Sequence, residues 1–430
     1  MVASSRKVVL ATLGNLGPPA AAFITAPVLA QSLGVFERGQ VAAGTAPLML
    51  AASAATLGLP EAVTFFVARG GPDRATKLAV KAIFVIGLAG LAATVAFVAL
   101  APLLAGGDGD VIQLIHLSLA MLLPSLSLLI LRALSAGRGR WGLIAVERSI
   151  GSVARLIAVV TLAAGGNLTI VSATLAISVS MWIGIVAYVG LLRRGTGPAN
   201  PVRSGKLLGY GTRVWFGALA GVLLSRVDQL LIAPLSNPAE LGIYVVAVAI
   251  AELVLVFNNA VRDVYFAEES RAPDMARIAQ AARVSTIITF GLAVGAAVVS
   301  MWGIPLLFGD EFAAAIVPTW ILLAAIVLGN PGSLAGAGLS AYGRPDLRSW
   351  SLLVALAANV AAVVLLVPAL GAVGAAWATA VGNVIAAGLN LVWVRRVSIE
   401  VGAVEFLRIR GEDFNMLVAT LMRRLGRGKK

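Results

Sequence analysis

The sequence predicts an all-α protein that crosses a membrane with about twelve helices, and three observations predict this fold class. Hydrophobic residues make up 59% of the 430 residues and charged residues only 12%, whereas soluble proteins carry about 25% charged residues. The apolar residues gather in runs of about 20 or more, the length that a helix needs to span a bilayer. These runs lack the alternating pattern of barrel strands. Helices are then the structure that can satisfy the hydrogen bonds of the backbone in lipid.

Twelve apolar runs divide the chain into two sets of six, which we interpret as two lobes. The predicted spans of the N-lobe (1–192) are 8–33, 41–67, 78–104, 111–136, 143–164 and 168–192. The predicted spans of the C-lobe (207–396) are 207–235, 241–265, 280–308, 313–339, 349–369 and 372–394. The polar, proline-containing stretch 193–206 predicts a cytoplasmic linker that joins two lobes able to move.

The tail after the last span has a different character. In residues 397–430, apolar side chains between Phe414 and Leu425 fall on one helical face, and Arg and Lys follow them. Such a basic amphipathic segment is expected to lie on the anionic cytoplasmic leaflet, in contact with membrane lipids.

The distribution of Lys and Arg predicts how the chain is oriented, because cytoplasmic loops are enriched in these residues. With the N-terminus inside, the inner loops hold Arg69, Arg74, Lys77, Arg138, Arg140, Arg193, Arg194, Arg203, Lys206, Arg271, Arg277, Arg344 and Arg348. The outer loops hold acidic residues, and Arg38 is their only basic residue. We therefore expect a multi-pass protein of the bacterial plasma (inner) membrane with both termini in the cytoplasm.

A weak internal repeat relates the two lobes. Three landmarks recur at separations of 203, 205 and 202 positions: Gly39 and Gly242, Ser135 and Ser340, and Arg193 and Arg395. Six-helix repeats that enter the membrane in the same direction are typical of transporters in which the substrate binds between two rocking lobes. Chance recurrence of Gly and Arg in loops is the alternative interpretation.

Composition excludes several kinds of function. The net charge is +13, but the basic residues lie in short loops between apolar runs, so we expect no nucleic-acid partner. The absence of Cys excludes disulfides and thiol chemistry, and a single His excludes a multi-histidine metal site. The sequence thus predicts no catalytic residues, no metal site and no cofactor.

Several segments resemble one transporter family. They are Leu33-Gly-Val-Phe-Glu-Arg38-Gly39, Thr56-Leu-Gly58-Leu-Pro60, Phe65-Phe66-Val-Ala-Arg69, Ser225-Arg226-Val-Asp228, Leu241-Gly242-Ile-Tyr244 and Gly371-Ala-Val-Gly374-Ala-Ala-Trp377-Ala-Thr379. In this order and spacing they are similar to Wzx-type polysaccharide flippases, the oligosaccharide branch of the multidrug/oligosaccharidyl-lipid/polysaccharide (MOP) exporter superfamily. The resemblance implies a V-shaped, two-lobed transporter, not an enzyme. Its substrate would be a polyprenyl-diphosphate-linked glycan, and glycan polymerases or glycosyltransferases would be its partners.

The implied diphosphate directs attention to arginines inside the spans, because guanidinium groups bind phosphate oxygens well. Arg155 lies about 18 Å into its predicted helix at 1.5 Å per residue, and Arg148 lies on the same face nearer the cytoplasm. We interpret both as substrate contacts that form a cationic track. The alternatives are that Arg148 reaches the membrane interface and that Arg155 pairs with a carboxylate elsewhere. Glu147 is interpreted as an interface charge.

The C-lobe supplies three further candidates. Arg226 is a candidate second diphosphate contact, and Asp228, two residues later, points in another direction. Glu252 lies near the middle of its predicted span, where a carboxylate can change protonation during transport. We therefore assign ion coupling to Glu252 and Asp228. A static ion pair between Glu252 and Arg155 or Arg226 is the alternative.

Other functions compete with glycan flipping. A drug or metabolite cation antiporter of the same superfamily would favour carboxylates over these arginines, and a lipid II flippase is a closer rival. A polytopic glycosyltransferase or polymerase would need a sizeable outer loop, whereas no predicted outer loop exceeds about ten residues. A non-transporting scaffold is the remaining alternative.

Overall fold

The computed structural model describes residues 2–70, 72–190, 204–269, 274–398, 401–408 and 410–413, which form helices joined by turns. The elements of the N-lobe are α1 (Val2–Ala55), α2 (Leu59–Gly70), α3 (Pro72–Leu104), α4 (Gly109–Leu119), α5 (Leu122–Gly137), α6 (Trp141–Ala164), α7 (Ile170–Ile183) and the 3₁₀ helix η1 (Gly184–Tyr188). Those of the C-lobe are α8 (Ser204–Leu235), α9 (Pro238–Glu269), α10 (Met275–Phe308), the 3₁₀ helix η2 (Asp310–Ala315), α11 (Ile316–Ala341), α12 (Pro345–Val394) and α13 (Ala403–Leu407). The described residues contain no strand, which confirms the all-α prediction.

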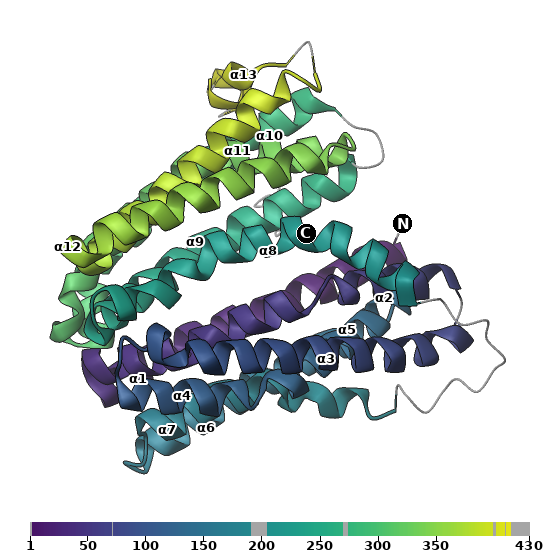
Figure 1. Cartoon of the computed structure of the whole chain (residues 1–430). Helices are drawn as coiled ribbons and strands as arrows, with labels where there is room; N and C mark the ends of the chain where they lie inside the picture. The colour runs from purple at the N-terminus through teal and green to yellow at the C-terminus, as the bar shows by residue number, and fades with distance from the viewer. Residues whose placement is uncertain are drawn as a thin grey trace, which may run out of the picture.

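The chain folds into two bundles that meet at one end and diverge towards the other (Figure 1). Helices α1–α7 make up one bundle and α8–α13 the other. The linker residues 193–203 lie outside the described residues. Helix α1 packs against both α8 and α9, which makes these three helices the main boundary between the lobes.

Nine stretches of the described residues are long and apolar enough to span a bilayer. Two of them are each two spans, because α1 contains Gly34 at φ +70° and α12 contains Gly371 at φ +52°. Only glycine adopts this left-handed conformation without strain, so the helix direction breaks there. Helix α6 is the remaining span; it has 24 residues but carries Glu147, Arg148 and Arg155. The protein thus crosses the membrane about twelve times, as predicted.

Two predicted spans are interrupted. The span at 41–67 breaks at a turn between α1 and α2, where Leu57 and Gly58 have φ of 47° and 66°. The span at 111–136 breaks between α4 and α5, at Ala120 and Met121. Apolar composition continues through both breaks, so hydropathy alone cannot locate them.

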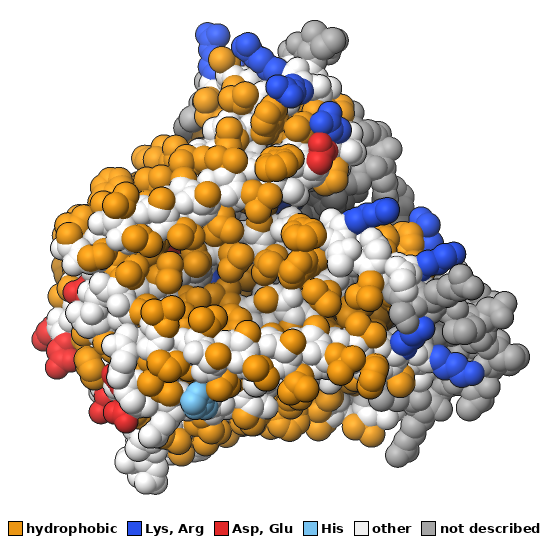
Figure 2. Space-filling view, viewed as in Figure 1, with side chains coloured by type: hydrophobic (Ala, Val, Ile, Leu, Met, Phe, Trp, Pro, Cys, Tyr) orange, Lys and Arg blue, Asp and Glu red, His pale blue; other side chains and the backbone are white. Residues whose placement is uncertain are grey.

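The charges separate to the two ends of the molecule. Figure 2 shows Lys and Arg gathered at the end where the lobes diverge, and Asp and Glu gathered at the opposite end. We call these the basic end and the acidic end. The apolar surface between them is the part that faces acyl chains, since charged side chains are costly in hydrocarbon.

Glycines bring the lobes into backbone contact at both ends. At the acidic end, a Cβ on Gly39 would lie 1.7 Å from the carbonyl oxygen of Pro238, and one on Gly242 would lie 2.1 Å from that of Val35. At the basic end, a Cβ on Gly58 would lie 2.1 Å from the carbonyl oxygen of Gly211. Any side chain at these positions would push α1 or α2 away from α8 or α9. The repeat landmarks Gly39 and Gly242 are therefore partners in one contact between the lobes.

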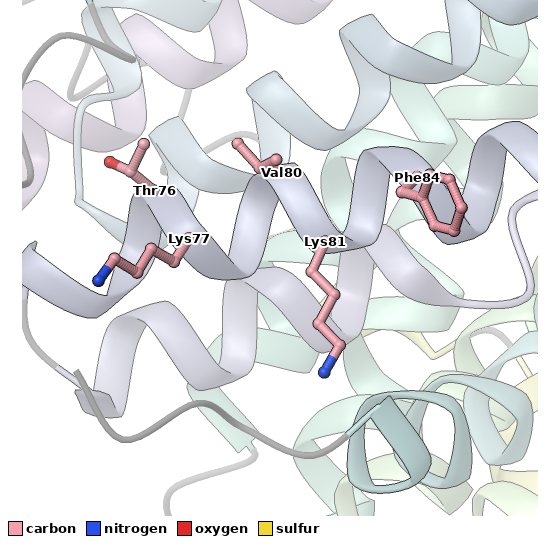
Figure 3. A pocket seen from close by; sticks show the side chains of 5 residues that line it. All are labelled: Thr76, Lys77, Val80, Lys81 and Phe84. Atoms are coloured by element: carbon pink, nitrogen blue, oxygen red, sulfur yellow. The ribbon is translucent and has the colours of Figure 1, made fainter.

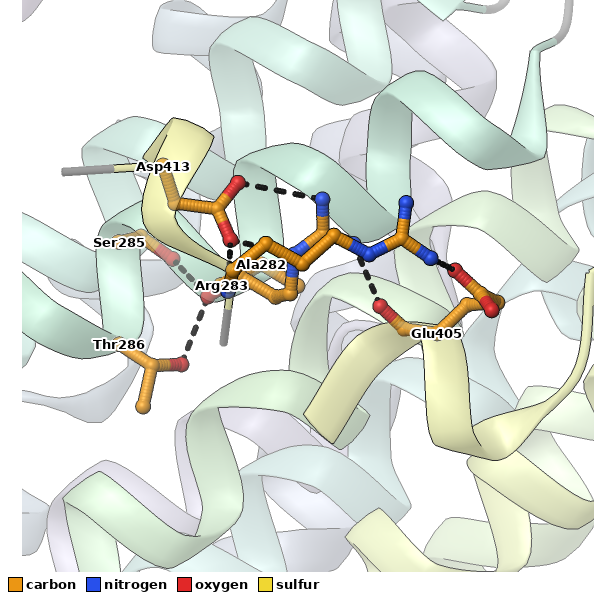
Figure 4. A network of polar contacts seen from close by, with 7 residues as sticks. Ala282, Arg283, Ser285, Thr286, Glu405 and Asp413 are labelled. Carbon is orange, nitrogen blue, oxygen red and sulfur yellow. Dashed lines mark hydrogen bonds and ion pairs between the residues drawn. The ribbon is translucent and has the colours of Figure 1, made fainter. Parts of the chain in front are cut away.

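The first part of the C-terminal tail packs on the basic end of the C-lobe. Arg283 on α10 donates from Nε to Asp413 Oδ2 at 2.7 Å and from Nη1 to the Glu405 carbonyl oxygen at 2.6 Å (Figure 4). Phe406 is buried among side chains of α10, α11 and α12. Residues 401–413 thus bind protein along their described length, whereas the predicted amphipathic stretch 414–430 lies outside the described residues.

Candidate functional site

Helix α6 has one face towards lipid and its arginines on the other. Val146, Val153 and Ile157 are 49%, 52% and 57% exposed and recur at helical spacing. Arg155 is about 200° around the helix from Val153, since successive residues turn about 100°, and Arg148 shares its side. Both arginines are only part-exposed. Neither side chain faces acyl chains, and both point into the protein.

Arg155 has no counter-charge among the residues whose side chains are described. Its Nε is shut off from solvent and makes no hydrogen bond. The surrounding protein shields its guanidinium group from water. The positive charge of Arg155 acts on Arg38. The pairing with a carboxylate that the sequence left open is therefore not found in the described part of the chain. A cation in this state is a strong binding group for an anion.

Arg38 occupies a different place from the one predicted. The sequence puts it in an outer loop, but Gly34 breaks α1 and Arg38 begins the next turn of helix, with its side chain directed inwards. Its Nε is also buried without a hydrogen bond, and its guanidinium group lies close enough to Arg155 for the two to repel. The residue that follows, Gly39, contacts α9 of the other lobe.

The predicted role of Glu147 is wrong. It is 3% exposed rather than interfacial, and Arg132 of α5 binds it in a fork, with Nε 3.0 Å from Oε2 and Nη2 2.8 Å from Oε1. Tyr188 donates to the same carboxylate at 3.4 Å. Arg132 was not among the predicted residues, although its charge inside the apolar run of α5 marks it as a candidate.

Arg148 lies beside this ion pair and adds a second positive charge to it. Its side chain is close enough to Arg132 and Glu147 to be affected by their charges. Since Arg132 already neutralises Glu147, the cluster keeps a net positive charge. Arg148 and Arg155 are seven residues apart on α6, about 10 Å along the helix axis. That the two cations form a track for a diphosphate stays a prediction.

In the C-lobe, Arg226 of α8 and Glu252 of α9 form an ion pair. Arg226 Nη2 lies 2.6 Å from Glu252 Oε1, and the two side chains are 29% and 34% exposed. This is the static pairing that the sequence left as the alternative role of Glu252. Protein covers about two thirds of each side chain.

Asp228 lies deeper than Arg226 and has different partners. It is 2% exposed and accepts hydrogen bonds from the hydroxyl of Tyr244 on α9, from Thr379 Oγ1 on α12 at 2.8 Å and from the Gln229 backbone N–H at 2.7 Å. The three side chains join α8, α9 and α12 through one buried carboxylate. Tyr244 and Thr379 belong to the segments that carry the family resemblance, but their convergence on Asp228 was not visible in the sequence.

The predicted site residues thus form three separate groups. Arg155 lies with Arg38 and Arg148 in the N-lobe, Arg226 lies with Glu252 on the C-lobe, and Asp228 is buried behind that pair. The described residues include no group of His, Asp or Glu that could hold a metal ion. The chemistry that this arrangement offers is binding of an anion by arginines in a protein interior.

A shallow pocket of about 500 Å³ lies apart from these groups, on α3 at the basic end. Figure 3 shows Lys77 and Lys81 extending from one side of α3, next to Val80 and Phe84. Val80 and Phe84 are 55% and 68% exposed. Lysines beside exposed apolar side chains suit the boundary between acyl chains and headgroups. We therefore place the candidate site at the interior arginines and not at this pocket.

Comparison with solved structures shows which fold this is. A structure of the lipid II flippase MurJ in an inward closed conformation aligns with a TM-score of 0.77 and 14% identity, over 96% of this chain and 93% of that one. An inward-facing multidrug resistance MATE transporter of the MOP superfamily aligns with 0.70 and 17% identity, over 90% and 98%. A MOP superfamily transporter from Pyrococcus furiosus aligns with 0.61 and 15% identity, over 91% and 95%.

The sequence comparisons complete this assignment. No curated protein matches the sequence. The family model for polysaccharide biosynthesis proteins matches residues 4–266, which is more than half of the chain. The protein therefore belongs to the polysaccharide biosynthesis family, and it is a multi-pass membrane protein whose fold is similar to that of these three solved structures.

Proposed function

We propose that this protein is a flippase that moves a polyprenyl-diphosphate-linked oligosaccharide, a precursor of a cell-surface polysaccharide, across the plasma membrane by alternating access. The observation that carries the proposal is Arg155: a desolvated cation without a counter-charge, on the protein-facing side of a spanning helix. A diphosphate would supply the missing negative charge. Family membership supports a substrate from polysaccharide biosynthesis.

Orientation follows from the ends of the molecule. The basic end would face the cytoplasm with both termini, because Lys and Arg accumulate in cytoplasmic loops. Most of the C-lobe diverges from the N-lobe at that end, and α8 contacts α2 there. A lipid-linked glycan made in the cytoplasm would enter there when this contact opens. Arg148 would meet the diphosphate first and Arg155 next, while the glycan occupies the space between the lobes and the polyprenyl chain stays in membrane lipids. Glycosyltransferases and a glycan polymerase, which make and consume such a substrate, would be the natural partners.

The C-lobe groups would couple transport to an ion. Arg226 released from Glu252 could bind a phosphate oxygen, and the freed carboxylate could then take up a proton or a cation. Asp228 is a second candidate for coupling, because two hydroxyl groups and a backbone N–H hold this buried carboxylate, without an ion pair to an arginine among the described residues. We assign ion coupling to Glu252 and Asp228 on this basis.

The experiment that tests this proposal is replacement of Arg155 in the host cell. Arg155→Ala should abolish export of the lipid-linked glycan at unchanged protein abundance, and Arg155→Lys should restore part of it, because a point charge attracts phosphate without the bidentate geometry. Arg213→Ala, which removes an exposed arginine of α8, is the matched control and should export normally. Normal export by Arg155→Ala would remove the arginine from the mechanism.

A further inference from the structure

We infer that Arg38 and Arg155 together form a second diphosphate-binding position, nearer the acidic end than Arg148, at which the substrate headgroup is held before release; this inference rests on the proposed function. Arg38 would thus be a substrate contact that the sequence places in a loop. The ligand class is an organic or inorganic diphosphate.

The two arginines are a pair of like charges that the protein brings together. Val41, three residues after Arg38, and Val159, four residues after Arg155, belong to one buried cluster, so each arginine lies about one helical turn from this shared contact. Each Nε is cut off from solvent and has no hydrogen bond. Leaving an uncompensated charge inside a protein is costly, and two in one region cost more. An anion between them would relieve the repulsion and satisfy donors that the described residues leave unpaired. A diphosphate offers several oxygens and two or more negative charges to the two guanidinium groups.

Buried hydroxyl groups on the neighbouring helices are a second, independent observation. Ser152 on α6 and Thr174 and Ser178 on α7 each have a buried side-chain oxygen without a hydrogen-bond partner. Helices α1, α6 and α7 pack against one another. Ser152 precedes Arg155 by three residues, so the two share a side of α6. Native proteins satisfy most buried polar atoms, and several unsatisfied ones beside two unpaired arginines indicate a place for a polar guest.

The position of Arg38 links this site to the movement of the lobes. Its neighbour Gly39 touches the backbone of Pro238 and Gly242 on α9, which is the contact that closes the acidic end. When the lobes separate there, Arg38 would become accessible from the acidic end. A headgroup that has moved from Arg148 to Arg155 and Arg38 would then lie next to the exit.

The test measures ligand binding to the purified full chain in nanodiscs, with geranylgeranyl diphosphate, geranylgeraniol and inorganic pyrophosphate as probes. Arg38→Ala should weaken binding of geranylgeranyl diphosphate about tenfold or more, as the loss of a charge-assisted hydrogen bond implies. Arg213→Ala should leave it unchanged, and geranylgeraniol should bind equally weakly to all variants. The double variant Arg38→Ala/Arg155→Ala should lose less than the product of the two single losses, because both groups hold one ligand.

Thermal unfolding separates this role from a structural one. Without ligand, Arg38→Ala should unfold at the same temperature as the parent or higher, because the repulsion is gone, and geranylgeranyl diphosphate should stabilise the parent more than the variant. A clear loss of stability in Arg38→Ala without ligand would overturn the inference, and so would unchanged affinity for geranylgeranyl diphosphate.

The probes also separate this inference from the proposed function. Binding of pyrophosphate alone, lost in Arg38→Ala, would uphold the anion site while it counts against a lipid-linked substrate. Unchanged diphosphate binding by Arg38→Ala, together with loss of export by Arg155→Ala, would overturn the role of Arg38 and leave the proposed function intact.

Discussion

At the scale of single residues, the charged side chains inside the membrane are of two kinds, paired and unpaired. Arg132 and Glu147 neutralise each other through two hydrogen bonds, and Arg226 and Glu252 do so through one close contact. Arg38 and Arg155 have no such partner in the described part of the chain. Since a charge in hydrocarbon is retained only where it pairs or functions, the paired arginines have a structural explanation and the unpaired ones need a ligand.

The Arg132–Glu147 pair should behave as a structural element. Glu147→Gln should destabilise the protein by about 3 kcal/mol, because it leaves Arg132 with an uncompensated charge. Arg132→Met combined with Glu147→Gln should recover most of that loss. The measurement is thermal unfolding in detergent, and a double variant no more stable than Glu147→Gln would contradict this explanation.

The Arg226–Glu252 pair should affect coupling rather than stability. Glu252→Gln should weaken the dependence of transport on the ion gradient, because the side chain can no longer exchange between Arg226 and an ion. Both side chains are about a third exposed, so the effect on unfolding should be small. Transport is measured with the gradient present and collapsed; unchanged coupling would leave Asp228 as the remaining candidate.

Residue identity alone predicted part of this site and missed the rest for a physical reason. Arg155 and Glu252 stand out because charges in apolar runs are rare. Arg38 does not, since it follows the end of an apolar run, and only the break at Gly34 turns it inwards. The partners Glu147, Tyr188, Tyr244 and Thr379 come from other helices, and one sequence carries no signal of which helices meet.

At the scale of helices, glycines decide where the lobes touch. Gly242→Val should hold the acidic end apart, because even a Cβ there would lie 2.1 Å from the Val35 carbonyl oxygen. We expect a large loss of transport without loss of folding. Gly87→Ala is the control, because a Cβ at Gly87 meets nothing within 4 Å. Distances between spin labels on α1 and α9 report the separation, and unchanged distances in Gly242→Val would contradict this account of the contact.

The C-terminal segment is held by an ion pair that should respond to acid. Burial alone would raise the pKa of Asp413, but hydrogen bonds from Arg283 and the Arg410 backbone N–H hold that pKa below its ordinary value of 3.8. The ionised carboxylate therefore favours docking above pH 3.8, and this contribution disappears as the pH falls through the lowered pKa. Proteolysis near residue 400 should increase only in strong acid, whereas Asp413→Asn should be cleaved at neutral pH. Equal protection of both proteins at neutral pH would contradict this role.

Hydropathy predicted where helices lie better than where they bend. The twelve apolar runs correspond to spans, because burial in lipid is decided by composition over about 20 residues. The breaks at Gly34, Leu57–Gly58 and Gly371 depend on single residues with positive φ inside apolar sequence. The docking of residues 401–413 depends on Phe406 and Asp413 meeting α10, which tail composition does not indicate.

At the scale of the whole molecule, two lobes touch through glycines at both ends, and the two arginines of the candidate site that have a buried, unbonded Nε both lie in the N-lobe. The N-lobe holds Arg38, Arg148 and Arg155, whereas the half-buried Arg226 of the C-lobe is paired with Glu252. This asymmetry favours an anionic substrate that binds the N-lobe first. An organic cation would find the carboxylates of Glu147 and Glu252 already paired with arginines.

The most direct test of the proposed function measures lipid flipping by the purified protein in proteoliposomes. The substrates to compare are a polyprenyl-diphosphate-linked oligosaccharide, lipid II and an organic cation. We predict rapid flipping of the oligosaccharide lipid by the parent protein and none above background by Arg155→Ala. Flipping of lipid II alone, transport of the cation alone, or equal flipping by parent and Arg155→Ala would contradict the account.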